Sequence, residues 1–371
     1  MKKLLFCLLM ICQTAMAQHL ELTSDKWEYK DGKVTFFERD GTRYMQIMAG
    51  NQGAVLLKDY EFWNGTIEFD FEPTGTLSLT SSPTLYFRSD AQMYNSELFY
   101  IRARPSNPRA NDAIQYAPIL GGVNMWDMYP QYQAPAFFEL NKTNHLKIVV
   151  NGAQMRVYLN DMTKPALQIP KLEGTGNGKL IGIDGGMIVS NFQLKPDQVE
   201  DLPAIPAPDL TEHDANYIRQ WSASLPIDLP MGNEPTQSSL PELEGFTKLL
   251  IAENAGLVNL TREFGANESR KLIFLKATIK SQEVSNPNMQ LGFSDEVWVF
   301  VNRQLAFLDK NIYRNPAMRK YPDGRISIQN ARFTLPLKQG ENEVIIAVAN
   351  DFFGWGIMAR LENMEGIELA K

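Results

Sequence analysis

The stretch from residue 62 to residue 126 constrains the fold of this chain most, because it alternates apolar and polar residues over four consecutive segments. In the first segment, Ile67, Phe69 and Phe71 alternate with charged residues, and Gly, Pro, Ser and Asn separate the segments. A period of two places successive side chains on opposite faces of a β-strand. The stretch therefore predicts strands with one buried face and one wet face that carries carboxylates, arginines and tyrosines.

Similar short patterns continue on both sides of this stretch, so that residues 18–196 contain about ten candidate strands separated by turn residues. Asn151-Gly152 is the strongest hairpin signal among these turns. No segment of this half has a convincing helical period. Many short strands at regular spacing are typical of a sandwich of two antiparallel sheets, so we expect one sandwich over residues 18–196.

The composition changes near Pro196, where four prolines and several acidic residues fall within PDQVEDLPAIPAPDL. Residues 197–240 are expected to form an extended, Pro-rich linker with a short helical turn at DANYIRQWSAS. Regular strand patterns return over residues 241–371, now with apolar residues at consecutive positions, as in buried sandwich strands. The predicted fold class is therefore all-β, with two β-sandwich domains joined by a Pro-rich linker.

The first 17 residues have the pattern of a cleavable signal peptide: Lys2 and Lys3, an apolar run and a small-x-small site at residues 15–17. Both cysteines lie in this segment, so the expected mature chain has no disulfide or thiolate ligand. We therefore expect an exported bacterial protein, periplasmic or extracellular. Without the two lysines, 34 basic residues face 43 acidic ones, which argues against nucleic acid and anionic membranes as partners.

An ordered series of motifs then resembles a known superfamily. FWNGTIEFD at residues 62–70, LYFR at 85–88, ELFYIR at 97–102, AIQY at 113–116 and Trp126 are followed by VYLN at 157–160 and IGI at 181–183. Together they resemble the concanavalin A-like lectin/glucanase superfamily, with laminin-G-like and 3-keto-disaccharide hydrolase-type jelly rolls as the nearest kin. The resemblance implies a curved jelly roll whose concave sheet often binds sugars.

The second half has motifs of its own. SDEVWVFVN at residues 294–302, LPLKQGENE at 335–343 and DFFGWG at 351–356 resemble the galactose-binding-like jelly roll that accompanies many glycosidases. Arg303 stands where the usual motif has glycine, so the turn there should differ. The resemblance implies a fold more than a ligand, because many such modules are structural.

The candidate ligand site lies on the wet faces of the central strands. Aromatic rings stack on the C–H faces of sugars, while arginines and carboxylates bind the hydroxyl groups. A solvated outer sheet face is the equally weighted alternative. The predicted ligand-binding residues are Asp70, Tyr86, Arg88, Glu97, Tyr100, Arg102, Gln115 and Trp126, with Tyr129 at the border.

Catalysis is a second hypothesis, because Glu68-x-Asp70-x-Glu72 resembles the motif of family 16 glycoside hydrolases. Residues i and i+4 of a strand lie roughly 13 Å apart at Cα, whereas a retaining pair needs about 5–5.5 Å between its carboxyl groups. The motif also precedes the strand that it follows in that family. If the protein is an enzyme, Glu97 with Asp70 or Glu68 would act, but a non-catalytic role is favoured.

The remaining signals are weak. The three histidines are scattered and no metal-ligand spacing occurs, so we expect no metal site and no cofactor, with a structural calcium ion left open. Trp298, Phe353 and Trp355 could form a sugar platform, although core packing is favoured for them. We therefore expect non-catalytic binding of a glycan or polysaccharide; the alternatives are a glycoside hydrolase-like enzyme and a scaffold module without a sugar site.

Overall fold

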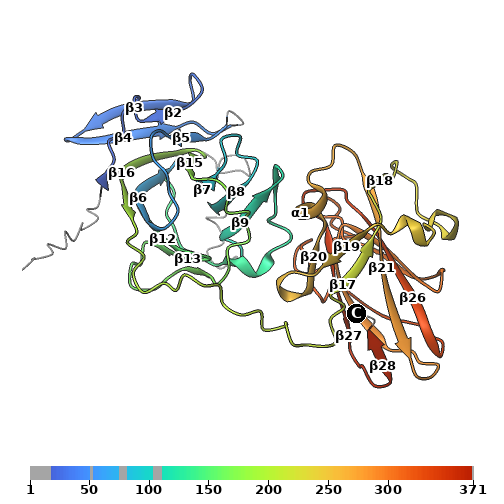
Figure 1. The fold of residues 1–371 in the computed structure, drawn as a ribbon. Helices are drawn as coiled ribbons and strands as arrows, with labels where there is room; N and C mark the ends of the chain where they lie inside the picture. The colour runs from blue at the N-terminus through green and yellow to red at the C-terminus, as the bar shows by residue number, and fades with distance from the viewer. Residues whose placement is uncertain (1–17, 51–52, 75–81, 103–110, 370–371) are drawn as a thin grey trace, which may run out of the picture.

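The computed structural model describes residues 18–50, 53–74, 82–102 and 111–369, and it consists of two β-sandwiches that lie side by side (Figure 1). The predicted all-β class with two sandwiches is confirmed, since the described strands form four antiparallel sheets. The predicted signal peptide at residues 1–17 lies outside the described part. Within that part, no helix is long and apolar enough to cross a membrane.

The first sandwich consists of two eight-stranded sheets, which we name the β6 sheet and the β8 sheet. The β6 sheet has the order β14-β13-β12-β6-β16-β4-β3, with β1 beside β16. Its strands are β1 (Gln18–His19), β3 (Val34–Arg39), β4 (Thr42–Ile47), β6 (Gly65–Pro73), β12 (Asn144–Asn151), β13 (Gln154–Leu159), β14 (Leu167–Ile169) and β16 (Met187–Pro196).

The β8 sheet has the order β10-β9-β8-β7-β15-β5-β2, with β11 beside β9. Consecutive strands β7, β8 and β9 pair as neighbours and come from the last three of the four alternating segments, whereas the first segment forms β6 of the opposite sheet. Its strands are β2 (Trp27–Glu28), β5 (Val55–Leu57), β7 (Thr84–Ser89), β8 (Ser96–Ile101), β9 (Ile114–Leu120), β10 (Val123–Asn124), β11 (Gln133–Ala134) and β15 (Leu180–Asp184).

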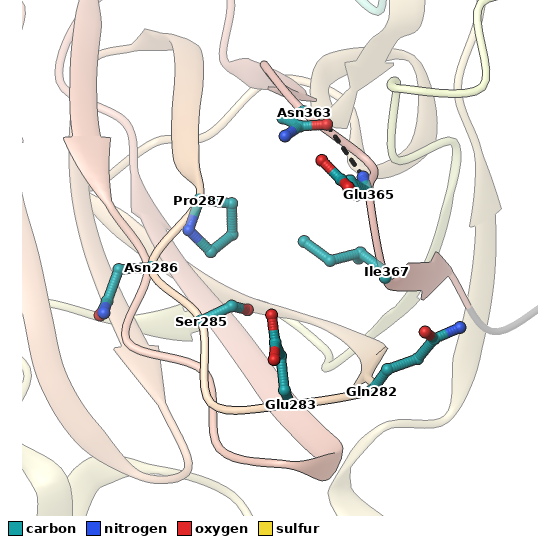
Figure 2. A pocket seen from close by; sticks show the side chains of 9 residues that line it. Gln282, Glu283, Ser285, Asn286, Pro287, Asn363, Glu365 and Ile367 are labelled. Carbon is teal, nitrogen blue, oxygen red and sulfur yellow. Dashed lines mark hydrogen bonds between the residues drawn. The ribbon is translucent and has the colours of Figure 1, made fainter.

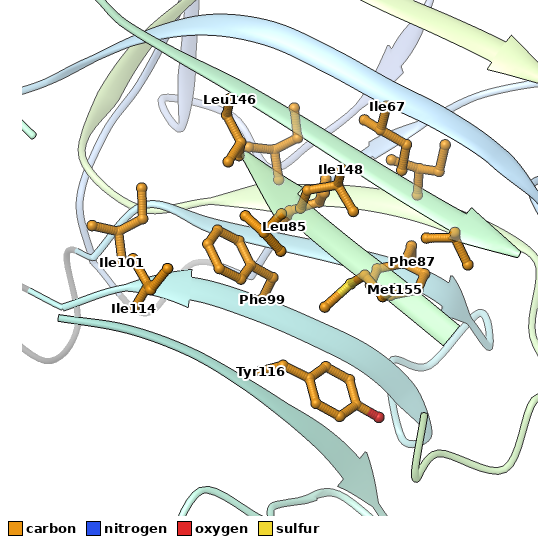
Figure 3. Close-up of a cluster of buried hydrophobic side chains, with 14 of the residues drawn as sticks. Ile67, Leu85, Phe87, Phe99, Ile101, Ile114, Tyr116, Leu146, Ile148 and Met155 are labelled. Atoms are coloured by element: carbon orange, nitrogen blue, oxygen red, sulfur yellow. The ribbon is translucent and has the colours of Figure 1, made fainter. Parts of the chain in front are cut away.

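The core of the first sandwich lies between these two sheets and is made of the apolar side chains that point inward from the strands of both (Figure 3). Ile67 and Phe69 of β6 are buried there, opposite Leu85 of β7 and Phe99 of β8. Burial of each large apolar side chain contributes about 1.5–3 kcal/mol, so this face fixes the register of the strands. The alternation read from the sequence therefore sorts the residues of β6 and β8 onto the correct faces.

The second sandwich consists of an eight-stranded sheet and a four-stranded sheet. The larger one, the β21 sheet, has the order β19-β17-β21-β26-β23-β24, with β18 and β28 also beside β21. The smaller one, the β22 sheet, has the order β20-β27-β22-β25. The strands are β17 (Gln220–Ala223), β18 (Ile227–Asp228), β19 (Lys248–Ile251), β20 (Leu257–Asn259), β21 (Lys271–Ser281), β22 (Asn288–Ser294), β23 (Glu296–Val301), β24 (Gln304–Lys310), β25 (Ala331–Thr334), β26 (Gly340–Ala349), β27 (Gly356–Leu361) and β28 (Ile367–Leu369).

Helical structure in the described residues is limited to single turns. The one α-helix, α1 (Leu260–Phe264), begins where the Asn259 side chain accepts a hydrogen bond from the Arg262 backbone N–H, and ends at Gly265, whose φ is 74°. The 3-10 turns are η1 (Pro130–Tyr132), η2 (Gln237–Ser239), η3 (Leu243–Gly245) and η4 (Asn254–Gly256).

The structure differs from the expected linker at residues 197–240. Instead of a helical turn at DANYIRQWSAS, β17 forms and buries Trp221 in the core of the second sandwich. Leu229 and Leu240 pack on the outer face of the β21 sheet, so this part of the Pro-rich segment belongs to the second sandwich. Residues 202–207 instead hydrogen-bond to the first sandwich. The carbonyl groups of residues 202, 204 and 205 accept hydrogen bonds from the β12–β13 hairpin, and the Ala207 N–H donates to the Pro170 carbonyl.

Candidate functional site

The structure places the predicted site residues in three separate locations. Asp70 lies on the outer face of the β6 sheet, while Glu97 and Arg88 are buried at one end of the first core. The other five lie on the outer face of the β8 sheet or directly beside it: Tyr86, Tyr100, Arg102, Gln115 and Trp126. A single surface through all eight residues therefore does not exist.

The group on the β8 sheet forms one hydrogen-bonded network. Tyr100 donates from its hydroxyl to Gln115 Oε1 over 2.9 Å, and Arg102 Nη2 donates to the Tyr100 hydroxyl over 2.9 Å and also to Gln115 Oε1. Gln115 Nε2 donates to the Trp126 carbonyl over 2.7 Å. Burial raises the pKa of Tyr100 to about 12, so its hydroxyl stays protonated at neutral pH. The network fixes the position of Trp126.

The second sandwich covers this network. The Trp126 ring meets Tyr313 with 4.7 Å between ring centroids and Phe353 with 5.9 Å, and both contacts are edge-to-face. The guanidinium carbons of Arg102 and Arg325 lie 5.6 and 5.0 Å from the centre of the Trp126 ring. As a result Trp126 is only 6% exposed, and its ring packs against both sandwiches.

Ion pairs, hydrogen bonds and apolar contacts also connect the two sandwiches. Arg325 of the second sandwich forms a buried ion pair with Asp112 of the first over 3.0 Å, and Arg102 lies 3.6 Å from the same carboxylate. Farther along, Arg262 Nη2 donates to the Glu173 carbonyl over 2.7 Å. Leu257, Ile326 and Met358 of the second sandwich belong to the apolar cluster of the first. The two sandwiches therefore pack as one unit.

Partly exposed rings surround this junction. Tyr313 and Phe352 stack in parallel with 5.8 Å between centroids, and Phe353 meets Phe352 edge-to-face at 4.3 Å. Phe353 is 40% exposed, while Tyr86 and Tyr313 are half-buried. Arg314 lies over the Phe352 ring with 4.1 Å to its centre. This group of Tyr86, Trp126, Tyr313, Arg314, Phe352 and Phe353 is the junction site.

Sequence reasoning found only part of the junction site. The sequence suggests Phe353 together with Trp298 and Trp355, and the favoured core packing is confirmed for both tryptophans, which are buried. Tyr313 and Phe352 were missed. The sequence signal at Phe352 is the pair of adjacent phenylalanines before Gly354, and Tyr313 has none. Trp126 precedes both residues by more than 180 positions, so the sequence does not show that the three rings lie close together in space.

Arg88 and Glu97 form a second, closed location. Alternation predicts that Arg88 shares a face with Tyr86, but Arg88 has a φ of 48° and the pairing of β15 with β7 shifts at this point. This bulge turns Arg88 toward Trp63, to whose carbonyl it donates from Nε over 2.9 Å. The expectation of a shared face is therefore wrong.

Glu97 faces inward, and its Oε2 accepts a hydrogen bond from the Tyr116 hydroxyl over 2.6 Å. Burial raises the pKa of Glu97, although the Tyr116 bond and the charge of Arg88 oppose the shift. A Cβ on Gly174 would lie 2.5 Å from the Glu97 carboxylate, which shows how tightly the loop before β15 seals this group.

Asp70 and Glu68 occupy the third location, together with His145, which the sequence shows only as one of three scattered histidines. His145 of β12 bonds Asp70 Oδ1 through Nδ1 at 2.6 Å and Glu68 Oε1 through Nε2 at 2.9 Å. The hydrogen bond to Asp70 is the main cause of a raised His145 pKa. Burial favours higher pKa values for Glu68 and Asp70, but their hydrogen bonds to Lys195, His145 and Asn191 outweigh it and lower both.

The arrangement of these carboxylates bears on the hydrolase alternative. Glu97 lies inside the sandwich, whereas Glu68 and Asp70 lie on the far side of the β6 sheet, so Glu97 does not share a cleft with either. Glu68 and Asp70 share His145, whose two ring nitrogens are both occupied. A histidine that acts as a general base needs a free ring nitrogen within reach of the substrate.

A hollow without these residues lies at the end of the second sandwich (Figure 2). Its volume is about 590 Å³, and polar side chains of the β21–β22 and β27–β28 loops line it, among them Glu283, Asn286 and Glu365. No aromatic ring lines it. Among the described residues, no group of three or more His, Cys, Asp or Glu side chains could hold a metal ion.

Comparisons with known proteins concern the fold. Searches against protein-family models and against curated proteins find no match to this sequence. Among solved structures, carbohydrate-binding module CBM66 from Bacillus subtilis is 16% identical, with a TM-score of 0.33 over 45% of this chain and 91% of that chain. Galectin LEC-6 from Caenorhabditis elegans is 18% identical, with a TM-score of 0.29 over 40% of this chain and 93% of its own.

The β-glucanase of Bacillus licheniformis is 10% identical, with a TM-score of 0.32 over 50% of this chain and 94% of its own. These proteins include a carbohydrate-binding module, a galectin and a glycosidase. At such identities and TM-scores the likeness carries no argument about ligand or reaction. The galactose-binding-like assignment of the second sandwich stays a prediction.

Proposed function

We propose that this is an exported, non-catalytic carbohydrate-binding protein that takes its glycan at the junction site. One observation carries the proposal: aromatic rings of both sandwiches meet there, Trp126 from the first and Tyr313 and Phe353 from the second, and Phe353 is left 40% exposed. An exposed ring beside polar groups suits the C–H face and the hydroxyls of a sugar. Export through the signal peptide at residues 1–17 is part of the same proposal.

In this proposal, the predicted binding residues Tyr100, Arg102 and Gln115 do not contact the glycan but hold Trp126 in position. Gln115 holds the Trp126 backbone, and Arg102 holds Gln115 and Tyr100. None of these three side chains is open to a ligand, since each is at least 90% buried. In this proposal they keep the Trp126 ring in place against Tyr313 and Phe353, so that the partly exposed rings form one surface.

A scaffold role without a sugar site is the second candidate. The burial of Tyr100, Arg102 and Trp126 beneath the second sandwich favours it, because the same contacts are sufficient to explain why these side chains are polar and aromatic. For the hydrolase alternative, no described arrangement of carboxylates offers comparable support.

Binding of the mature chain, residues 18–371, to a glycan array followed by titration calorimetry tests the proposal. Phe353→Ala should weaken binding about two- to tenfold, because aromatic contacts contribute roughly 0.5–1.5 kcal/mol beyond area burial. Phe137→Ala is the matched control, since Phe137 is 64% exposed in the loop before β12, where its carbonyl accepts a hydrogen bond from Asn160. Absence of any bound glycan, or equal affinities for the Phe353 variant and the wild type, would favour the scaffold role.

A further inference from the structure

Arg314 differs from the other arginines of the junction. It is exposed, and its guanidinium carbon lies 4.1 Å from the centre of the Phe352 ring. Within the described part of the chain it has no carboxylate partner. Asp351 is adjacent to Phe352 in sequence but does not form an ion pair with Arg314.

The neighbouring arginines each have an acidic partner. Arg319 pairs with Asp323 over 3.0 Å and also donates to the Tyr313 carbonyl over 2.8 Å. Arg325 and Arg102 share the buried Asp112. Arg314 is therefore a cation without an acidic partner, in a chain with a formal charge of −7, and it lies beside the exposed ring of the junction site.

The position of this cation relates directly to the exposed ring. Arg314 lies over Phe352, and Phe353 meets the same Phe352 ring at 4.3 Å between centroids. A ligand the length of a disaccharide would therefore reach both the Phe353 ring and the Arg314 guanidinium. A guanidinium binds planar and tetrahedral anions through two parallel N–H donors, with more specificity than an ammonium group.

We propose that the junction site selects acidic glycans, in which a uronate carboxylate or a sulfate group binds Arg314 while a sugar ring stacks on Phe353. The inference rests on the proposed function and narrows it to one ligand class. Because much of the remaining surface charge is negative, recognition of a polyanion depends on this local cation and weakens as salt screens it.

The test measures affinity of the full mature chain for three probes: polygalacturonate, a sulfated galactan and a neutral galactan. We expect the neutral polymer to bind at least tenfold more weakly than an acidic one. Arg314→Gln should reduce acidic binding by about tenfold, as expected for loss of a charged hydrogen bond of roughly 1.5 kcal/mol, and Arg314→Lys should restore part of it. Binding of polygalacturonate alone identifies carboxylate as the recognised group, and binding of both acidic probes identifies the charge.

Arg39→Gln is the matched control. Arg39 is also exposed and also lies over aromatic rings, 5.8 Å from the centres of Phe37 and Tyr44, but on the β3–β4 hairpin of the first sandwich. Equal losses in the Arg39 and Arg314 variants would overturn the inference, since they would indicate general charge attraction. Binding of the neutral galactan in preference to both acidic polymers would overturn the inference and leave the proposed function standing; no binding of any glycan would remove both.

Discussion

Two buried carboxyl groups meet at the loop that carries the exposed ring of the junction. Asp295 of the second sandwich accepts hydrogen bonds from the backbone of Asp351 and Phe352, the second over 2.8 Å. Asp127 of the first sandwich accepts one from Gly354 over 3.4 Å. Burial, together with the charge of Asp295, raises the pKa of Asp127 well above its ordinary value. Two single residues thus hold residues 351–354 from opposite sides.

The first prediction at this scale concerns pH. Burial raises the pKa of Asp295 from 3.8 to about 7. A raised folded-state pKa means that the unfolded chain releases its proton first, so stability should fall as pH rises from about 4 to about 7, by at most about 4 kcal/mol. Asp295→Asn should flatten this part of the pH profile, because the amide oxygen still accepts the two backbone hydrogen bonds but the amide does not ionise.

Urea unfolding between about pH 4 and about pH 8 measures the difference between Asp295→Asn and the wild type. The exposed Asp40, whose φ of 50° asparagine also tolerates, supplies the control Asp40→Asn, which should keep the wild-type slope. A constant difference between Asp295→Asn and the wild type over this range would contradict the assigned titration.

At the scale of elements, the β12–β13 hairpin shows how a turn secures the chain between the sandwiches. Gly152 has a φ of 53°, as the Asn-Gly turn predicts. A Cβ there would lie 2.0 Å from the Ala204 carbonyl oxygen, which accepts a hydrogen bond from the Ala153 N–H over 2.8 Å. Asn151 Nδ2 donates to the Leu202 carbonyl over 2.6 Å. The hairpin tip and residues 202–204 therefore form one contact.

Gly152→Ala should disrupt that contact, whereas Gly32→Ala provides the matched control. Gly32 has a φ of 77° with no atom within 4 Å of an added Cβ, so its substitution has only the backbone penalty of about 1–2 kcal/mol. We expect Gly152→Ala to lose roughly 1–3 kcal/mol more, because two hydrogen bonds are disturbed as well. Urea unfolding measures the difference, and protease cleavage near residue 204 should accelerate only in the Gly152 variant; equal losses would contradict the contact.

The elements also show which parts of the site could be predicted from sequence. Alternation predicts that Tyr100 and Arg102 share one face of their strand, and the two side chains are hydrogen-bonded to each other on the outer face of the β8 sheet. It failed at Arg88, because a positive φ inside a strand has no signal in the pattern of residues. It also could not join Asp70 to His145, since strand pairing between β6 and β12 brings together residues 75 positions apart.

At the scale of the whole molecule, the function of the β8 face depends on how the sandwiches dock. The sequence identified the residues of this face but had no means to show that Arg325 and Tyr313 would cover them, because the covering loop has no motif and lies about 200 residues away. Docking is what converts a predicted open sheet into a buried network with exposed rings at its edge. The junction site exists only when both sandwiches are in place.

The buried ion pair between Arg325 and Asp112 makes this dependence measurable. Arg325→Ala removes one partner of a pair whose side chains are both less than a tenth exposed, which typically destabilises by about 3–5 kcal/mol, and it also uncovers the Trp126 ring. Arg332→Ala removes an arginine that is 61% exposed in its ion pair with Glu362, and it should change stability by less than about 1 kcal/mol. Arg325→Lys should recover part of the loss.

Scanning calorimetry distinguishes loss of docking from simple loss of stability. Because the sandwiches share one apolar cluster, the wild type should unfold in a single transition, whereas Arg325→Ala should unfold in two, one for each sandwich. The glycan affinity of Arg325→Ala should fall with docking, since Phe353 then loses its contact with Trp126. A single transition at an unchanged midpoint in Arg325→Ala would show that the apolar contacts of Leu257, Ile326 and Met358 alone join the sandwiches.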